Sequence, residues 1–174
     1  LPELGAAHRL DRLTAGVLLL TTQRRWRAPY QRLFERQATR KSYDALAPLR
    51  PDLRLPATIR SHIQKYRGNL QAVQLPHAAP NAETVIELVE TRGQVGRYRL
   101  TPRTGKTHQL RVHLNSLGIP ILGDPLYPTV TELDADNFDS PLELVARTLE
   151  FTDPVDETPR RYTSRVGLNW PDAP

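Results

Sequence analysis

The sequence predicts a single globular domain in which β-strands outnumber helices. Six segments show strand-like alternation or short apolar runs, whereas only two carry apolar residues at helical spacing. The chain has 174 residues, which is enough to bury a core without disulfides or metal. Its 39% hydrophobic and 25% charged residues are typical of a globular protein.

The strand-like segments are spread over the whole chain and are rich in β-branched and aromatic residues. They are residues 17–22, 41–47, 57–63, 83–91, 95–101 and 142–151. The first is a continuous apolar run, which predicts a buried strand. In the second, alternation places Tyr43 and Ala45 on one face. The fourth and fifth are close enough in sequence to form a hairpin.

Two segments predict helices. Apolar spacing from Trp26 to Gln37 predicts the first, with Pro29 acceptable in its first turn. Residues 107–117 predict the second, with Thr107 as the N-cap and Gly118 just beyond its end.

The second predicted helix has two different faces. Its apolar stripe consists of Leu110, Leu114 and Leu117. At about 100° per residue, His108, Arg111 and Asn115 fall on another side, where they could face a cleft.

Four segments predict connections. Proline-punctuated residues 48–56 form a connector, and residues 68–81 predict an irregular, exposed loop. The sequence at 123–125 has turn chemistry, and residues 131–140 predict an acidic loop.

Charge favours a polyanionic partner. The net charge is +5 and the pI is about 9.9. Of the 24 basic residues, 21 are arginines, which bind phosphate bidentately and stack on bases. Codon usage in a GC-rich genome would give the same bias, so composition alone does not establish RNA binding.

Nothing in the sequence indicates secretion or membrane insertion. The longest apolar run, residues 17–20, is far too short to cross a bilayer, and no charged-then-apolar leader precedes it. We therefore expect a cytoplasmic protein. The chain starts at Leu1 and contains no methionine, so we expect a single domain over residues 1–174 that lacks its N-terminal portion.

Three look-alike patterns are excluded. Residues 104–107 resemble the end of a phosphate-binding P-loop, but Leu100 stands where the first glycine is required. Residues 8–11 have the wrong order for a kinase catalytic loop. His108 and His113 are five apart, which does not fit an i, i+4 zinc pair.

The most informative segments are residues 8–12 and 103–113. The first places Asp11 between Arg9 and Arg12, so we expect a carboxylate that stays ionised at neutral pH. Such a group suits a nucleophile better than a proton donor. The second segment supplies cations and polar donors that could hold an anion and a substrate.

Together with two further segments, these resemble the RluA-type family of pseudouridine synthases, which isomerise uridine in ribosomal or transfer RNA. The similar segments are residues 8–20, 41–45, 81–84 and 104–127, in the order that the family has them. The resemblance implies an α+β fold with a long, mixed, mostly antiparallel sheet flanked by helices. It also implies an active site in a cleft across the sheet, an RNA partner, no cofactor, no metal and a monomer.

By position in these segments, the resemblance makes Asp11 the catalytic aspartate and Arg111 its ion-pair partner. Tyr43 becomes the residue that stacks on the target base and removes the C5 proton. Each has a simpler alternative: Asp11 as a turn cap, Tyr43 as a core residue and Arg111 as a surface cation.

The remaining site residues are assigned to RNA or substrate binding. They are Arg9, Arg12, Lys106, Thr107, His108 and Gln109. Arg9 is expected to help hold the target base out of its stack. For Lys106, His108 and Gln109, the expected role is either contact with RNA or support of other site residues. The chain has Ala15 where the family commonly has serine, and Lys106 where it has arginine, which affects RNA positioning rather than chemistry.

The hypothesis is therefore uridine isomerisation in RNA, with Asp11 attacking either the ribose C1′ or the base C6. The alternatives are a non-catalytic RNA-binding or RNA-folding protein on the same scaffold and a basic structural protein of the ribosome.

Overall fold

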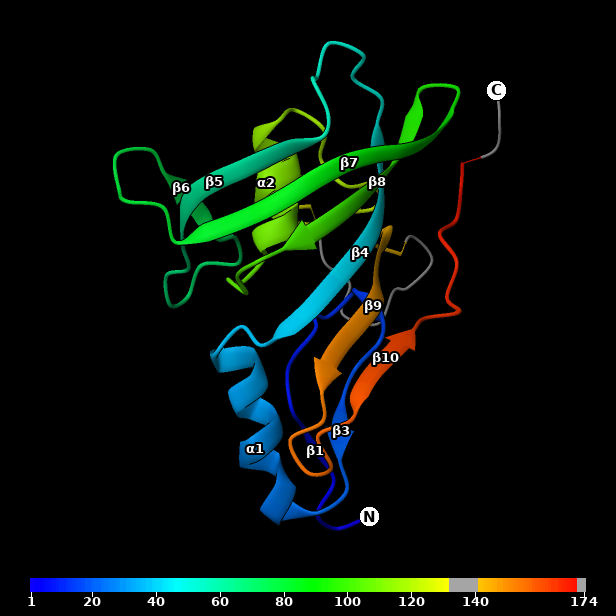
Figure 1. Ribbon diagram of the computed structural model, residues 1–174. Coiled ribbons are helices and arrows are strands. Elements are labelled where there is room, and N and C mark those ends of the chain that lie inside the picture. Colours follow the sequence, from blue (N-terminus) through cyan, green and yellow to red (C-terminus); the bar gives the residue numbers. More distant parts are fainter. Residues whose placement is uncertain (132–140, 172–174) are drawn as a thin grey trace.

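A long, twisted sheet runs through the molecule and carries one helix near each end (Figure 1). The computed structural model describes residues 1–131 and 141–171, so the acidic loop expected at 131–140 lies almost entirely outside the described residues. The main sheet contains β2 (Ala15–Gly16), β4 (Thr39–Pro48), β5 (Ala57–Gln64), β6 (Val73–Leu75), β7 (Ala82–Arg92), β8 (Val95–Pro102), β9 (Leu144–Thr152) and β10 (Pro159–Thr163). The remaining elements are β1 (Gly5–Ala6), β3 (Leu20–Thr21), α1 (Arg24–Glu35) and α2 (Gln109–Ser116).

The strand order confirms the expected α+β class with a mixed, mostly antiparallel sheet. The order is β10-β9-β4-β8-β7-β5-β6, with every neighbouring pair antiparallel. β2 adds a short parallel pairing to β9. The predicted hairpin of β7 and β8 is present, and Gly93 with φ 54° supplies the left-handed turn residue that it needs.

The prediction of a buried strand at 17–22 was wrong about its burial. Only β3 is a regular strand there, and it pairs with β1 in a two-stranded sheet outside the main one. Leu18 is 43% exposed and Leu20 is 45% exposed. Since α1 packs beside this small sheet, alternate side chains remain on its uncovered face.

Helix α1 begins and ends two residues earlier than predicted. Pro29 is therefore the sixth helical residue rather than part of the first turn. Gln37 adopts φ 55° just after the helix, which ends the helical path. The inner side of α1 is fixed by Tyr30, whose hydroxyl donates to Asp153 at 2.9 Å, and by Phe34, which stacks on His8 at 4.4 Å.

Helix α2 starts at Gln109, so the expected N-cap role of Thr107 was wrong. His108 occupies the N-cap position in the left-handed region, with φ 57°, and makes no capping bond. The loop is fastened instead by the Gln109 side-chain oxygen, which accepts bonds from the Thr104 hydroxyl at 2.7 Å and the Lys106 N–H at 3.0 Å. The apolar stripe of α2 and Gly118 beyond its end are as predicted.

The core lies between α2 and the face of the sheet that it covers. Leu110 and Leu114 pack there against buried residues of β4, β7 and β8. The loop at 68–81 is more ordered than expected because β6 pairs with β5. Ala72 is also buried, and its N–H and C=O both bond to the Tyr127 hydroxyl.

The opposite face of β4 holds a buried ion cluster. Asp44 is 1% exposed and lies 2.9 Å from Arg147 Nε. Arg97 and Arg99 approach the same carboxylate at 3.5 Å and 3.4 Å. This cluster fixes β4 between its two neighbours, β8 and β9.

His113 is a fully buried residue of α2 whose two ring nitrogens lie 2.9 Å from the hydroxyls of Ser61 and Thr84. Burial lowers the pKa of His113 to about 4, so the ring is neutral at pH 7. An unfolded chain binds a proton at this histidine below about pH 6.5, whereas the folded chain binds it only near pH 4.

We therefore expect the free energy of unfolding to fall as the pH drops from 6.5 toward 4, by about 2–3 kcal/mol from His113 alone. Urea denaturation at pH 7 and pH 4.5 measures this loss. His113→Gln should show a smaller loss than wild type, and His77→Gln, at an exposed position, should show the wild-type loss. An equal loss in all three proteins would contradict the assignment to His113.

Candidate active site

A cavity of about 500 Å³ opens where β4 meets the start of α2. It gathers almost all of the predicted site residues. Those that line it are Arg9, Asp11, Tyr43, Lys106, Thr107, His108, Gln109 and Arg111. Arg12 is exposed and does not line the cavity. The three proposed catalytic groups therefore share one site, although they are separated by up to a hundred residues in sequence.

Asp11 is held by a loop that is fastened at several points. Its carbonyl accepts the Thr14 N–H at 2.9 Å, which closes a tight turn. Downstream, Gly16 lies so close to β9 that a Cβ would sit 2.3 Å from the Ala146 oxygen. Upstream, His8 Nε2 accepts the Leu19 N–H at 3.1 Å. These contacts fix the backbone on both sides of the aspartate.

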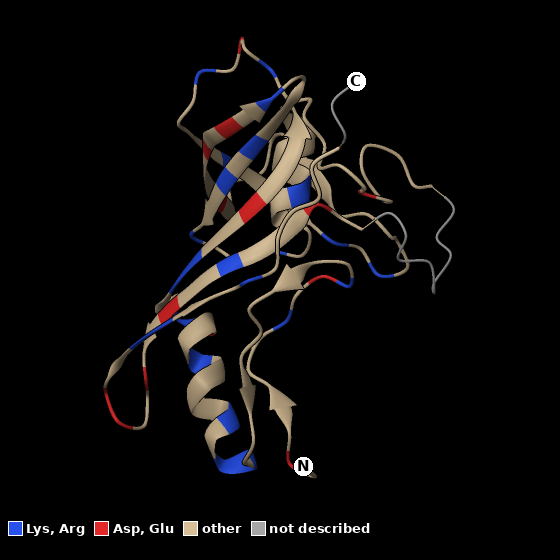
Figure 2. Cartoon of the chain, turned by 90° about the vertical axis from the view of Figure 1, so that its right-hand side faces the viewer, with Lys and Arg blue, Asp and Glu red and all other residues tan. Residues whose placement is uncertain are grey.

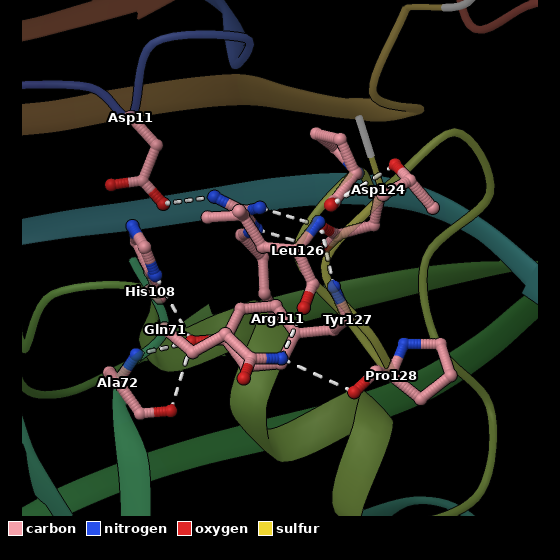
Figure 3. Close-up of polar contacts among 11 residues, drawn as sticks. Asp11, Gln71, Ala72, His108, Arg111, Asp124, Leu126, Tyr127 and Pro128 are labelled. Atoms are coloured by element: carbon pink, nitrogen blue, oxygen red, sulfur yellow. Dashed lines mark hydrogen bonds and ion pairs between the residues drawn. The ribbon is translucent and has the colours of Figure 1, made fainter. Parts of the chain in front are cut away.

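Arg111 lies between two carboxylates (Figure 3). Its Nε and Nη2 bond to Asp124 at 2.8 Å and 2.6 Å, and its Nη1 lies 3.5 Å from Asp11 Oδ2. Burial alone would lower the pKa of Arg111, but the two carboxylates raise it overall. The guanidinium is thus permanently charged, firmly bound to Asp124 and more loosely paired with Asp11.

Asp124 is a site residue that the sequence analysis missed, because its segment was interpreted only as a turn. Its side chain is fully buried, and it also accepts the N–H groups of Leu126 at 2.8 Å and Tyr127 at 3.2 Å. A carboxylate inside an otherwise apolar stretch needs a buried cation, and this was the available signal. Asp124 fixes the direction of Arg111 without lining the cavity.

Tyr43 faces the cavity from β4, next to a register shift between Ser42 and Tyr43 in the pairing with β9. Such irregularities re-aim side chains at functional sites. Burial, with a contribution from the charge of Asp11, raises the pKa of Tyr43 to about 12. The phenol is therefore neutral at pH 7.

The side chains of Gln109 and His108 make hydrogen bonds with other parts of the protein. The Gln109 amide nitrogen donates to the Glu83 carbonyl and to Thr84 Oγ1, both at 2.9 Å, while its oxygen holds the preceding loop. This geometry favours the supporting role for Gln109. His108 Nδ1 lies 3.1 Å from the Tyr127 hydroxyl, and burial lowers the pKa of His108.

Lys41 is a second residue that the sequence analysis did not assign to the site. Its ammonium lines the cavity, and no carboxylate lies within 4 Å of it in the part of the chain that the structure describes. Burial lowers the pKa of Lys41. Its position two residues before Tyr43 on the same strand was the available signal.

Residues 1–131 and 141–171 contain neither a candidate metal site nor a candidate membrane-spanning helix. No group of three or more His, Asp or Glu side chains there could hold a metal ion. No helix in these ranges has the length and apolar character needed to cross a membrane.

Comparison with known proteins indicates one family. The family model described as RNA pseudouridylate synthase matches residues 1–116. An uncharacterized RNA pseudouridine synthase of Haemophilus influenzae is 37% identical over 75% of this chain and 58% of its own length. The dual-specificity RNA pseudouridine synthase RluA of Vibrio vulnificus is 30% identical over 88% of this chain and 62% of its own.

A solved structure, human RNA pseudouridylate synthase domain containing 1, superimposes with a TM-score of 0.74 at 25% identity, over 93% of this chain and 69% of that chain. The chain belongs to the RNA pseudouridylate synthase family, and the resemblance to its RluA-type members is confirmed. It spans about three fifths of the length of the two bacterial relatives named above.

Proposed function

We propose that this protein isomerises uridine to pseudouridine in RNA, with Asp11 as the nucleophile. The observation that carries the proposal is the meeting of Asp11, Tyr43 and Arg111 at one cavity. Membership of the pseudouridylate synthase family supports the same reaction. A carboxylate in the cavity would repel the phosphate groups of RNA, so a protein that only binds RNA would not benefit from it. This disfavours a purely binding role.

The chemistry needs a carboxylate that is held in place but not fully neutralised. Arg111 provides this, because its short bonds go to Asp124 and only the 3.5 Å contact goes to Asp11. Attack at C1′ would form an ester as the N1–C1′ bond breaks and uracil leaves with the N1 electron pair, whereas attack at C6 would form an adduct in which the N1–C1′ bond then breaks. In either route the base re-bonds to C1′ through C5 and Asp11 is freed.

Loss of the C5 proton completes the reaction and falls to Tyr43 in this proposal. Its ring can lie against the base while its hydroxyl reaches the proton. The negative charge of Asp11 contributes to the raised pKa of Tyr43.

The cavity also suits a single extruded nucleotide. Its volume of about 500 Å³ is within the usual range for small-ligand sites. Extrusion of a base costs a few kcal/mol, which contacts from Arg9, Lys41 and Lys106 at the cavity can offset. We propose that the reaction needs neither metal nor cofactor, since the net reaction is an isomerisation. The proposed protein is monomeric and cytoplasmic.

Release of tritium from RNA that carries 5-tritiated uridine tests the proposed function. Purified protein should release tritium from transcribed ribosomal RNA or transfer RNA in a time-dependent manner. Absence of release from both classes of RNA would contradict the proposal.

Tyr43→Phe is expected to bind RNA with nearly wild-type affinity and to lose about 10²–10⁴-fold in tritium release. The ring remains available for stacking, but the proton-transfer group is gone. Tyr66→Phe, at an exposed position outside the cavity, should keep full activity. Wild-type turnover in Tyr43→Phe would exclude a role for this hydroxyl in proton transfer.

A further inference from the structure

The outer side of α1 carries a row of arginines. Arg24, Arg25, Arg32 and Arg36, at the helix and its C-cap, are all exposed, and we call them the arginine face. At about 100° per residue they fall within one third of the helix circumference. In Figure 2, segments coloured for basic residues occur along the length of this helix.

Eleven arginines in the part of the chain that the structure describes have no carboxylate within 4 Å, and four of these form the arginine face. Ten arginines elsewhere lie within 4 Å of a carboxylate: Arg50, Arg60, Arg92, Arg97, Arg99, Arg103, Arg111, Arg147, Arg160 and Arg161. In the described part of the chain, none of the arginine face has such a partner. Residues 24–41 contain seven basic side chains and one acidic side chain, Glu35.

This arrangement works against the stability of the helix. Arg24, Arg25 and Arg27 lie in the first turn, where the helix dipole is positive and no acidic residue of the helix compensates them. Only the Glu3 carboxylate, which accepts the Arg24 N–H at 3.2 Å, opposes this charge. A local conflict of this kind is expected where the residues serve binding rather than folding.

The arginine face adjoins the active-site cavity. Gln31, Phe34 and Glu35 of the same helix line that cavity. On the helix surface, Glu35 is the i+3 neighbour of Arg32, and Gln31 lies about 20° from Arg24 around the helix axis at about 100° per residue. The arginine face therefore borders the side of α1 that lines the cavity.

We propose that the arginine face binds the phosphate backbone of a base-paired RNA stem beside the target uridine. The row is about 18 Å long from Arg24 to Arg36, which allows contacts with several phosphates. The aromatic residues of α1 do not form a stacking platform, since Tyr30 bonds to Asp153, Phe34 stacks on His8, and half-buried Trp26 has the Arg25 guanidinium 5.0 Å from its ring centroid. Guanidinium groups without exposed rings suit a helical backbone better than unpaired bases. This inference rests on the proposed function and names the RNA structure that the site accepts.

The test compares binding of two RNA probes by fluorescence anisotropy between about 50 and 200 mM salt. One probe is a hairpin with a base-paired stem and a uridine loop, and the other is a single strand with the loop sequence alone. The quadruple variant R24Q/R25Q/R32Q/R36Q should bind the hairpin on the order of 10- to 100-fold more weakly. The slope of log affinity against log salt concentration should become less steep by about one for each phosphate contact that is lost. Binding of the single strand should change little.

The matched control is R54Q/R67Q/R92Q/R165Q, which removes the same charge from exposed positions outside α1 and should bind the hairpin as wild type does. Misfolding is tested with R24Q/R25Q, because neutralising the helix N-terminus should not lower thermal stability. Equal weakening for both probes, or in the control variant, would overturn the inference. Binding is measured without turnover, so a failure of the proposed reaction shows only in tritium release.

Discussion

Asp11→Asn is expected to reduce tritium release by about 10⁴-fold or more. The carboxamide has nearly the same size but lacks the charge and the nucleophilic oxygen that form the covalent intermediate. The fold should persist, because Arg111 keeps its two short bonds to Asp124. Tritium release from RNA containing 5-tritiated uridine measures the loss, and unfolding by urea checks stability.

The control for this substitution is Asp52→Asn, an exposed aspartate that pairs with Arg50 and lies outside the cavity. It should release tritium at the wild-type rate. Binding of RNA by Asp11→Asn should be unchanged or stronger, because one negative charge is removed from a cavity proposed to receive a nucleotide. Wild-type turnover in Asp11→Asn would refute the nucleophile assignment.

Asp124→Ala is expected to lower the free energy of unfolding by about 3–5 kcal/mol. The substitution leaves the buried Arg111 guanidinium without its bidentate partner, and two backbone N–H groups lose their acceptor. The total free energy of unfolding of a domain of this size is about 5–15 kcal/mol, so part of the population should unfold on mild heating. The folded fraction should also lose activity, since Arg111 is then free to swing toward Asp11.

Urea denaturation of Asp124→Ala beside Asp52→Ala separates this effect from the loss of a surface charge. Asp52 is exposed, and its removal should leave the denaturation midpoint nearly unchanged. A midpoint for Asp124→Ala that equals that of the control would show that the buried pair does not stabilise the fold.

The parts of the fold that depend on local periodicity were predictable. Alternation in β5, β7 and β8 is local, because these strands bury mainly one face, whereas β4 and β9 each bury several consecutive residues. The exposure of Leu18 and Leu20 was not predictable, since it depends on where the small β1–β3 sheet lies relative to α1. The short strands β6 and β10 have too few residues to show a period.

The cavity residues were predictable as a set because they occur in recognisable segments, and the structure places all but Arg12 at one cavity. The side-chain contacts between segments that are distant in sequence could not be predicted. The Arg111–Asp124 pair, the pinning of Gln109 to Glu83 and Thr84, and the left-handed His108 that displaced the expected N-cap all depend on tertiary contacts.

The buried ion cluster on the far side of β4 has a consequence for how this strand can vary. Tyr43 and Asp44 are adjacent, yet one faces the reacting nucleotide in the proposed mechanism and the other faces three guanidinium groups. Neighbouring positions on one strand are thus subject to separate constraints, one chemical and one mechanical. Substitutions at the cluster should change the lifetime of the folded enzyme. The turnover rate of each folded molecule should stay the same.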